Sequence, residues 1–216
     1  MKTIPILALL CVWTAHAADA PVAGTVKEDF EQGFDRWQPS AAQNWKITED
    51  HGGKVLDLFD KTARTKPPHR SPFNFVLLKD QEFGDVSITA KVRTTTKAYG
   101  HRDIVVIFGY QDEGHYYYVH FGEKADDHAC QVFIVNGADR KKISTKETTG
   151  IPWKEDTWHT VCVTRTAEGM IRVYFDDMEN TVLEAKDTTF GAGQIGFGSF
   201  DDTARFDDVV VTGERP

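Results

Sequence analysis

The stretch GYQDEGHYYYVHFG, residues Gly109 to Gly122, holds the alternation that decides the fold. The turn residues Asp-Glu-Gly at 112–114 separate two apolar runs, a pattern typical of a tight β-hairpin. Successive side chains of a strand point to opposite faces, so the three consecutive tyrosines cannot form one cluster. We expect the more apolar set to face the core and the set with polar tips to face away from it. The two sets are Tyr117, Val119 and Phe121, and Tyr116, Tyr118 and His120.

The same period of two recurs along the chain. It is clearest in residues 86–93, 160–164 and 171–175, where β-branched and aromatic residues are frequent. Turn residues at 136–139 and 167–169 predict two further hairpins. No segment keeps a 3.6-residue period over three helical turns. We therefore expect an all-β fold, a two-sheet antiparallel jelly-roll sandwich of about fourteen strands.

The first residues have the pattern of a secretory signal peptide. Lys2 precedes an apolar run over 4–13, and Ala15-His16-Ala17 ends it as a small-x-small cleavage site. The run is shorter than the roughly 18 residues that a spanning helix needs, so we expect no membrane insertion. We predict a signal peptide over 1–17, a secreted or periplasmic location, and a single jelly-roll domain over 18–216, because no linker or repeat divides that part.

Two cysteines follow the predicted cleavage site. In an oxidising compartment Cys130 and Cys162 could form a disulfide. They could equally remain two small buried hydrophobic residues. The sequence leaves both interpretations open, since spacing does not show how close the two Cα atoms come.

Charge is unevenly distributed along the chain. The net charge is -8, yet residues 61–102 contain nine Lys/Arg and only three Asp/Glu. An acidic chain with one basic band is a poor nucleic-acid binder, but such a band could guide an anionic group to one place. The alternative is that these basic side chains neutralise acidic neighbours in the fold.

Several short motifs follow one another in order along the chain. They are EDFE (28–31), Trp37, WKI (45–47), GGKVL (52–56), FGDVSI (83–88), QD with YYYV (111–112, 116–119), WHTV (158–161), IRVYFDD (171–177), GQIGF (193–197) and FDDV (206–209). Together they resemble the concanavalin A-like (laminin-G-like) jelly rolls, over nearly all of the chain after residue 17. That superfamily includes lectins, carbohydrate-binding modules, glycoside hydrolases, alginate-type lyases and 3-keto-disaccharide hydrolase-type domains. By analogy, the resemblance implies a connection with glycans. Together with the predicted signal peptide, it leads us to expect an exported protein that binds an oligo- or polysaccharide on its concave sheet.

Catalysis is less well supported by the motifs. A retaining glucanase of this superfamily would carry E-x-D-x-x-E, which places two carboxylates across the scissile bond. The nearest run, DDME at 176–179, is interpreted as a hairpin turn. A lyase would need a Tyr/His pair for proton transfer, but the arginine-rich and Gln-Ile-His-type strands of alginate lyases are missing. A 3-keto-disaccharide-type hydrolase and a structural or protein-interaction module stay open, and no catalytic residue is assigned.

The predicted saccharide site combines the polar face of the hairpin strand with nearby basic loops. Aromatic rings with polar tips can stack on sugar C–H faces and hydrogen-bond hydroxyls. Arginine would take carboxylate, sulfate or hydroxyl groups, so the ligand could be anionic. The expected substrate-binding residues are His69, Arg70, His101, Arg102, Tyr116, Tyr118 and His120. The alternative is an aromatic face packed under a neighbouring loop.

A metal site between the two histidines of the hairpin strand is excluded by alternation, since His115 and His120 point to opposite faces. The resemblance implies a different site, a structural calcium where the first and last strands meet. Asp207 fits that place, with Glu28 and the carbonyl of Gly53 as partners, and calcium prefers such oxygen ligands. The alternative is a solvated aspartate pair beside an edge strand.

Overall fold

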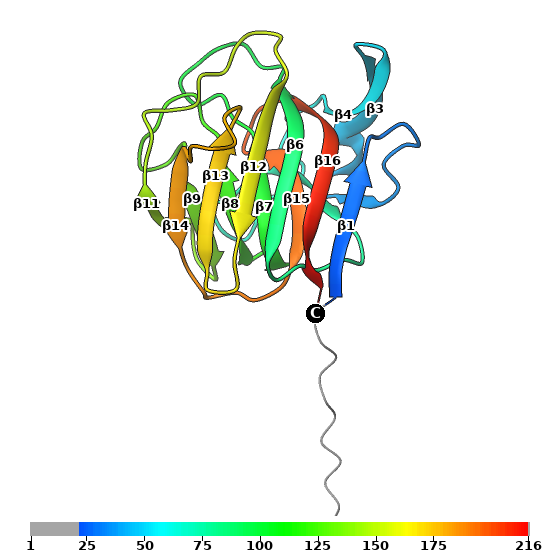
Figure 1. The fold of residues 1–216 in the computed structure, drawn as a ribbon. Helices are drawn as coiled ribbons and strands as arrows, with labels where there is room; N and C mark the ends of the chain where they lie inside the picture. Colours follow the sequence, from blue (N-terminus) through cyan, green and yellow to red (C-terminus); the bar gives the residue numbers. More distant parts are fainter. Residues whose placement is uncertain (1–21, 216) are drawn as a thin grey trace, which may run out of the picture.

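The computed structural model describes residues 22–215 and shows two antiparallel sheets packed face to face (Figure 1). This all-β jelly-roll sandwich confirms the predicted fold class. In the described part of the chain, one sheet has nine strands. Their order is β11 (Ser144–Lys146), β14 (Leu183–Lys186), β13 (Met170–Phe175), β12 (His159–Arg165), β6 (Val86–Thr94), β16 (Ala204–Arg215), β4 (Gly53–Leu58) and β3 (Trp45–Asp50), with β1 (Val22–Glu28) paired to the second half of β16.

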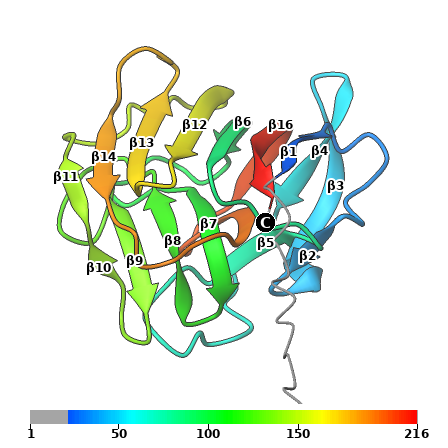
Figure 2. The same ribbon diagram turned by 60° about the horizontal axis from the view of Figure 1, so that its bottom comes forward.

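Seven strands of the described residues form the second sheet, which comes forward in Figure 2. Their order is β10 (Lys141–Lys142), β9 (Val132–Asn136), β8 (His115–His120), β7 (Val105–Asp112), β15 (Gln194–Ser199), β5 (Asn74–Leu78) and β2 (Trp37–Pro39). A single 3₁₀ turn, η1 (Ala42–Asn44), precedes β3. The three predicted hairpins are confirmed as the β7–β8, β9–β10 and β12–β13 connections.

The core lies between the sheets and is mostly apolar and aromatic. Trp37 on β2 lies 5.8 Å, between ring centroids, from Phe197 on β15, which in turn lies 5.7 Å from Phe206 on β16. All three rings are essentially inaccessible to solvent. They therefore join the two sheets through one continuous aromatic contact, with the tilted geometry that aromatic pairs prefer.

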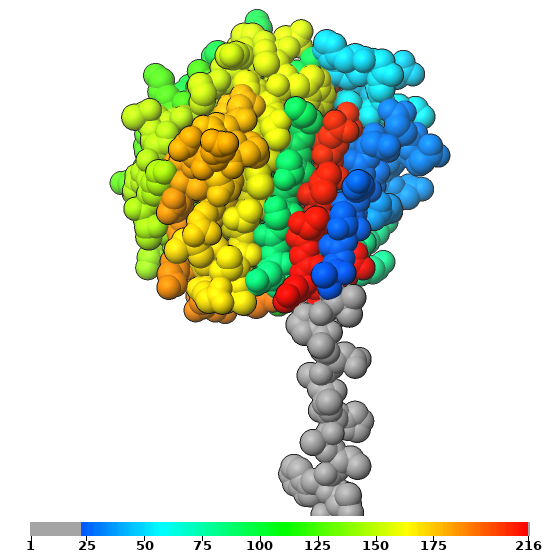
Figure 3. Space-filling view, viewed as in Figure 1, coloured from blue at the N-terminus to red at the C-terminus, as the bar shows by residue number. Residues whose placement is uncertain are grey.

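The outer faces of the two sheets differ. On the nine-stranded sheet, Ser87, Thr164 and Thr212 point outward, and Figure 3 shows its strands side by side and uncovered on that face. The outer face of the seven-stranded sheet carries a second buried apolar cluster instead. That cluster consists of Leu77, Val105, Ile107, Tyr116, Tyr118, Phe133 and Val135.

Three expectations about the chain as a whole have different outcomes. Cys130 and Cys162 are both free and buried, so the disulfide does not form and the alternative is correct. The predicted signal peptide over 1–17 lies outside the described residues. Within residues 22–215, no helix is long and apolar enough to cross a membrane.

Close approach between strands makes Gly196 on β15 sensitive to substitution. A Cβ atom there would lie 2.2 Å from the carbonyl oxygen of Val76 on the neighbouring strand β5. We expect Gly196→Ala to lower the free energy of unfolding by about 1–3 kcal/mol, because the paired backbones must separate. Denaturant unfolding measures this. Gly191→Ala is the matched control, since nothing lies within 4 Å of its added Cβ; equal effects of the two variants would contradict the predicted strand packing.

Candidate functional site

Strand β8 separates the three tyrosines as the alternation predicts. Tyr117 and Val119 belong to the main core between the sheets, and Tyr117 stacks on Phe108 with 5.4 Å between ring centroids. Tyr116 and Tyr118 belong to the outer cluster. The assignment of the two faces is therefore confirmed.

The outer face of β8 is nevertheless buried. Tyr116 and Tyr118 are 1% and 0% exposed, and His120 is 4% exposed. Such side chains offer a sugar no open ring to stack on. The expectation of an open sugar-stacking face is therefore corrected in favour of the alternative, an aromatic face packed under a neighbouring loop.

The cover is the connection between β4 and β5, residues 59–73, which we call the covering loop (Figure 2). Its Ser71 and Pro72 are buried, and a cavity of only about 60 Å³ remains where Lys66, Pro67 and Pro72 meet Tyr116. Prolines restrict the backbone of this loop before it packs, which lowers the entropic cost of holding it in place. The loop therefore fills the place where the sequence predicted a binding groove.

Arg140 completes the cover at the far end of β8. Its Nη1 donates to the hydroxyl of Tyr118 at 3.2 Å, and its Nη2 donates to the carbonyl of His128 at 2.7 Å. The guanidinium lies 4.9 Å above the Phe133 ring and 4.3 Å above the Phe200 ring. Cation–π contacts of this kind stabilise a partly buried arginine. The sequence analysis missed this residue.

The predicted loop residues do not converge on one pocket. The backbone N–H of Arg70 donates to Asp139 at 2.8 Å, and the ring of His69 lies beside Gly114. Both residues therefore lie near the β7–β8 and β9–β10 turns, at the Tyr116 end of β8. His101 lies elsewhere, with its Nε2 3.3 Å from Asp126.

Arg102 has a structural environment and is corrected as a ligand-binding residue. It is 1% exposed, and its guanidinium donates at 2.8 Å to both Glu123 and Glu155. A further hydrogen bond of 3.2 Å reaches the carbonyl of Trp153. With its donors engaged by these groups, Arg102 joins three loops and is not available to a carboxylate or sulfate of a ligand.

At the His120 end of β8, three carboxylates come together. Asp103 lies just before β7, and Asp201 and Asp202 lie in the turn between β15 and β16. One oxygen of each lies within 4.8 Å of the others, the only such group of three or more His, Cys, Asp or Glu residues found in 22–215. Asp103 and Asp202 are fully buried, whereas Asp201 is exposed.

Hydrogen bonds hold this acidic cluster in place. Asp103 accepts from the hydroxyl of Ser199 and from the backbone N–H of Phe200, both at 3.0 Å. Oδ2 of Asp202 accepts from the hydroxyl of Tyr99 at 2.8 Å and from the backbone N–H of Asp103 at 3.1 Å. Charged acceptors make strong hydrogen bonds, so the two buried carboxylates are rigidly oriented.

Burial and mutual repulsion dominate the electrostatics of the cluster. Burial raises the pKa of Asp103 well above its usual value, and the negative charges of Asp202 and Asp201 raise it further. Burial also raises the pKa of Asp201, again with help from Asp202. Burial, with Arg140 and His101 nearby, lowers the pKa of His120 to about 3. His120 is therefore neutral near pH 7 and supplies no positive charge to Asp103, 3.6 Å away.

The cluster borders solvent at two residues. Asp201 is exposed, and the ring of Tyr99 is 41% exposed while its hydroxyl is fixed by Asp202. Burial, and then the bond to Asp202, raises the pKa of the Tyr99 hydroxyl, which keeps it protonated. An oriented ring beside carboxylate acceptors can bind a polyhydroxylated molecule through its C–H face and its hydroxyls.

Of the residues predicted for calcium, Glu28 ends β1 and Asp207 lies on its partner β16, whereas Gly53 begins β4. They are not equally suited to the ion. Glu28 already accepts from the backbone N–H of Phe30 at 3.1 Å and from Nε1 of Trp37 at 3.3 Å. Burial raises the pKa of Asp207 to about 6, and the charges of Asp208, Asp29 and Glu31 contribute. Glu31 also lies beside Gly53, since its Oε1 accepts from the next backbone N–H, that of Lys54, at 2.7 Å. The acidic surroundings of Asp207 therefore fit a cation better through Asp29 and Glu31 than through Glu28.

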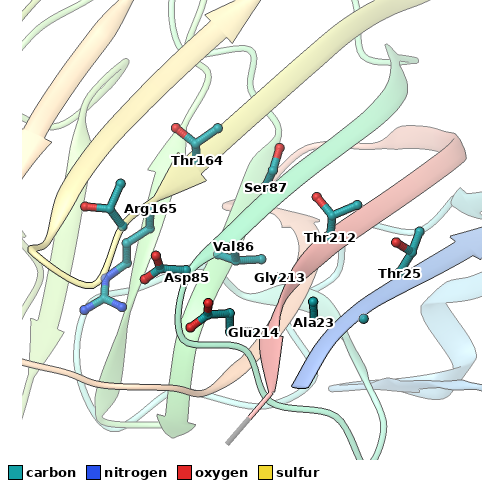
Figure 4. Close-up of a pocket in the computed structure, with 12 residues that line it drawn as sticks. Ala23, Thr25, Asp85, Val86, Ser87, Thr164, Arg165, Thr212, Gly213 and Glu214 are labelled. Carbon is teal, nitrogen blue, oxygen red and sulfur yellow. The ribbon is translucent and has the colours of Figure 1, made fainter. Parts of the chain in front are cut away.

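A separate hollow of about 470 Å³ lies on the outer face of the nine-stranded sheet (Figure 4). A row of hydroxyl side chains lies there, one from each of four neighbouring strands and paired in register: Thr25, Thr212, Ser87 and Thr164. None of the predicted site residues lines it. The hollow is shallow and holds no buried charged cluster comparable to the aspartates, so we place the candidate site at the aspartates.

Comparisons with known proteins identify the fold. The chain matches no protein-family model and no curated protein. It is similar to the carbohydrate-binding module CBM66 from Bacillus subtilis, with a TM-score of 0.55, 18% identity and coverage of 84% of this chain and 96% of the module. A Bacillus subtilis protein of unknown function with a galectin-like fold has a TM-score of 0.57 and 13% identity, with 91% and 99% covered. The cellulose-induced protein Cip1 has a TM-score of 0.56 and 12% identity, with 86% and 96% covered. These similarities confirm a lectin-like β-sandwich.

The contrast between neighbouring residues 101 and 102 can be tested by mutation. We expect Arg102→Gln to lower the free energy of unfolding by about 3 kcal/mol, because it removes the partner of two carboxylates and a buried carbonyl. His101→Gln should leave stability within about 0.5 kcal/mol, since its side chain is exposed. Urea unfolding compares the two. A stable Arg102→Gln protein would show that the arginine does not join these loops.

Proposed function

We propose that the protein is an exported saccharide-binding domain. The sugar binds at the His120 end of the seven-stranded sheet, where Tyr99, His101, Asp201 and the buried aspartates lie. This moves the site that we expected on the concave sheet from the tyrosine face to the end of that sheet. Export is proposed from the signal-like segment 1–17 alone.

The observation that carries the proposal is the exposed ring of Tyr99 held by Asp202 beside Asp201. The ring of Tyr99 is 41% exposed, and a 2.8 Å hydrogen bond from its hydroxyl to Asp202 fixes the direction of its open face. Carboxylate oxygens accept hydrogen bonds from pairs of sugar hydroxyls, and the ring face packs on sugar C–H groups. The names of two neighbours in fold, a carbohydrate-binding module and a cellulose-induced protein, agree with this chemistry by analogy.

A neutral saccharide fits the site better than an anionic one. The site carries three carboxylates, and the nearest basic groups are already engaged: Lys61 lies 3.7 Å from Asp202, and Arg140 bonds to Tyr118 and His128. Elsewhere in the basic band, Arg64 pairs with Asp60, and Arg102 pairs with Glu123 and Glu155. Lys61, Arg64 and Arg102 therefore neutralise acids within the fold. Of the two predicted arginine ligands, Arg70 is exposed and Arg102 is buried.

Binding is favoured over catalysis by the burial of the groups that a lyase would use. Tyr116, Tyr118 and His120 cannot reach a substrate beneath the covering loop. A hydrolase of the 3-keto-disaccharide type stays a prediction without assigned catalytic residues, and a protein-interaction module is the remaining class. Assays for reducing ends and unsaturated products, run beside the binding test, separate these alternatives.

Tyr99→Ala tests the saccharide site. We expect the purified protein to bind neutral oligosaccharides on a glycan array, and the variant to bind them at least about tenfold more weakly, because the stacking ring is lost. Titration calorimetry with the best array ligand measures the affinity. Met178→Ala is the control, since Met178 is exposed to about the same degree, 42%, and lies in the connection between β13 and β14 of the nine-stranded sheet. An array without any signal would contradict saccharide binding, and unchanged affinity in Tyr99→Ala would place the site elsewhere.

We also propose a structural calcium ion at Asp207, close to where we expected it. The raised pKa of Asp207 in the folded protein, about 6 against an ordinary 3.8, means that its charge opposes folding above pH 6. That opposition is lost as the pH falls through 6 and is absent below about 4, where the carboxyl is protonated in both states. Calcium would relieve the same repulsion at neutral pH.

Melting temperatures with calcium and with a chelator test this ion. At pH 7 we expect calcium to raise the melting temperature of the wild type, because an ion that binds only the folded state stabilises it. Asp207→Asn should remove most of that shift and, in chelator, should melt above the wild type. The advantage of the variant in chelator should shrink as the pH falls from 7 to 4. Equal calcium shifts in both proteins would exclude Asp207 as a ligand.

A further inference from the structure

We propose that Asp103, Asp201 and Asp202 form a binding site for a divalent cation of the calcium type, separate from the one expected at Asp207. Asp103 lies just before β7 of the seven-stranded sheet, and Asp201 and Asp202 lie in the turn between β15 and β16. Asp103 is 98 positions from Asp201 and 99 from Asp202 in sequence, so the fold itself brings its oxygen within 4.8 Å of theirs. The inference does not depend on saccharide binding.

An unsatisfied oxygen of Asp202 points to a missing ligand. Asp202 is fully buried, and its Oδ2 has two hydrogen bonds, yet its Oδ1 is buried without a hydrogen-bond partner in the described part of the chain. A buried carboxylate oxygen without a partner costs free energy, and native proteins rarely retain one. A cation between the three carboxylates would satisfy this oxygen.

The neighbouring positive groups do not replace such a cation. Nζ of Lys61 is the nearest, 3.7 Å from Oδ1 of Asp202, which exceeds hydrogen-bonding distance, and its side chain is 57% exposed on the covering loop. His120 faces Asp103, but its Nε2 lies 3.6 Å from Oδ2 of Asp103, which also exceeds hydrogen-bonding distance. His101 and Arg140 act on Asp201 only at longer range, and their direct partners are Asp126, Tyr118 and His128.

Hydrogen bonds orient the buried carboxylates in the way that groups around a metal site orient its ligands. Ser199 and the backbone of Phe200 hold Asp103, while Tyr99 holds Asp202. Groups that fix the direction of a ligand carboxylate commonly accompany metal sites. The exposed side of Asp201 leaves room for water ligands, and a set of carboxylate and water oxygens suits calcium better than zinc, which prefers nitrogen and sulfur.

Terbium luminescence tests the site directly, because Tb³⁺ resembles Ca²⁺ and is sensitised by a nearby tyrosine. Tyr99 contacts Asp202 and would act as the sensitiser. The measurement uses the full predicted mature chain carrying Asp207→Asn, which removes the other proposed ion. We expect saturable Tb³⁺ luminescence that Ca²⁺ displaces, and calorimetry should give the Ca²⁺ affinity without any sugar present.

Variants of the cluster decide whether the signal comes from these residues. Asp201→Asn should weaken Ca²⁺ at least tenfold without unfolding the protein, since Asp201 is exposed. Asp127→Asn is the control, an exposed aspartate paired with Lys142. Lys61→Met should leave Ca²⁺ affinity unchanged or increase it, because a competing ammonium is removed. The proposal is overturned if the parent protein binds neither ion, or if Asp201→Asn and Asp127→Asn bind Ca²⁺ equally well.

Discussion

The seven-stranded sheet is apolar on both faces, and this constraint shapes the rest of the molecule. Residues Val105 to Phe108 of β7 are completely buried, although their side chains alternate between the two faces. The inner face is covered by the nine-stranded sheet. The outer face needs a second cover, because exposing it would leave a large apolar patch in water. The covering loop, Arg140 and Phe200 supply that cover.

This cover determines where a ligand can bind. With the loop docked through Arg70 and Asp139, the middle of the sheet is closed, and polar groups near solvent remain only toward its ends. At the His120 end these groups include Tyr99, Asp201 and the two buried aspartates. The proposed site is therefore a consequence of how the sheet is covered, and it lies beside the tyrosines that the sequence made prominent.

Alternation predicted the local features well and the long-range ones poorly. It separated Tyr117 from Tyr116 and Tyr118 correctly, because the period of a strand is a property of neighbouring residues. It did not show whether the outer face is open, since that depends on the proline-rich covering loop, which has no periodicity. The bond from Arg70 to Asp139 spans 69 residues, and no local signal announces it.

Residues 101–103 show again that a local sequence pattern does not reveal long-range partners, here at the candidate site. His101 is exposed, Arg102 bonds to Glu123 and Glu155, and Asp103 bonds to Ser199. Their partners are 21, 53 and 96 positions away, so three adjacent charged residues enter three different environments. The sequence placed His101 and Arg102 in a predicted site, but the approach of Asp103 to Asp201 and Asp202 could not be read from it.

The buried aspartates differ from the other buried charges of this fold. The side chain of Asp50 is only 5% exposed, but Arg93 and Arg205 both bond to it, so its charge is compensated. Asp103 and Asp202 have mainly neutral donors and each other, and like charges at low dielectric oppose folding. A sandwich that needed only stability could replace them with apolar residues, as it does from Val105 to Phe108 of the adjoining strand β7. Retaining two buried acids whose nearest cation is the largely exposed Lys61, 3.7 Å from Asp202, therefore favours a bound partner that supplies more positive charge.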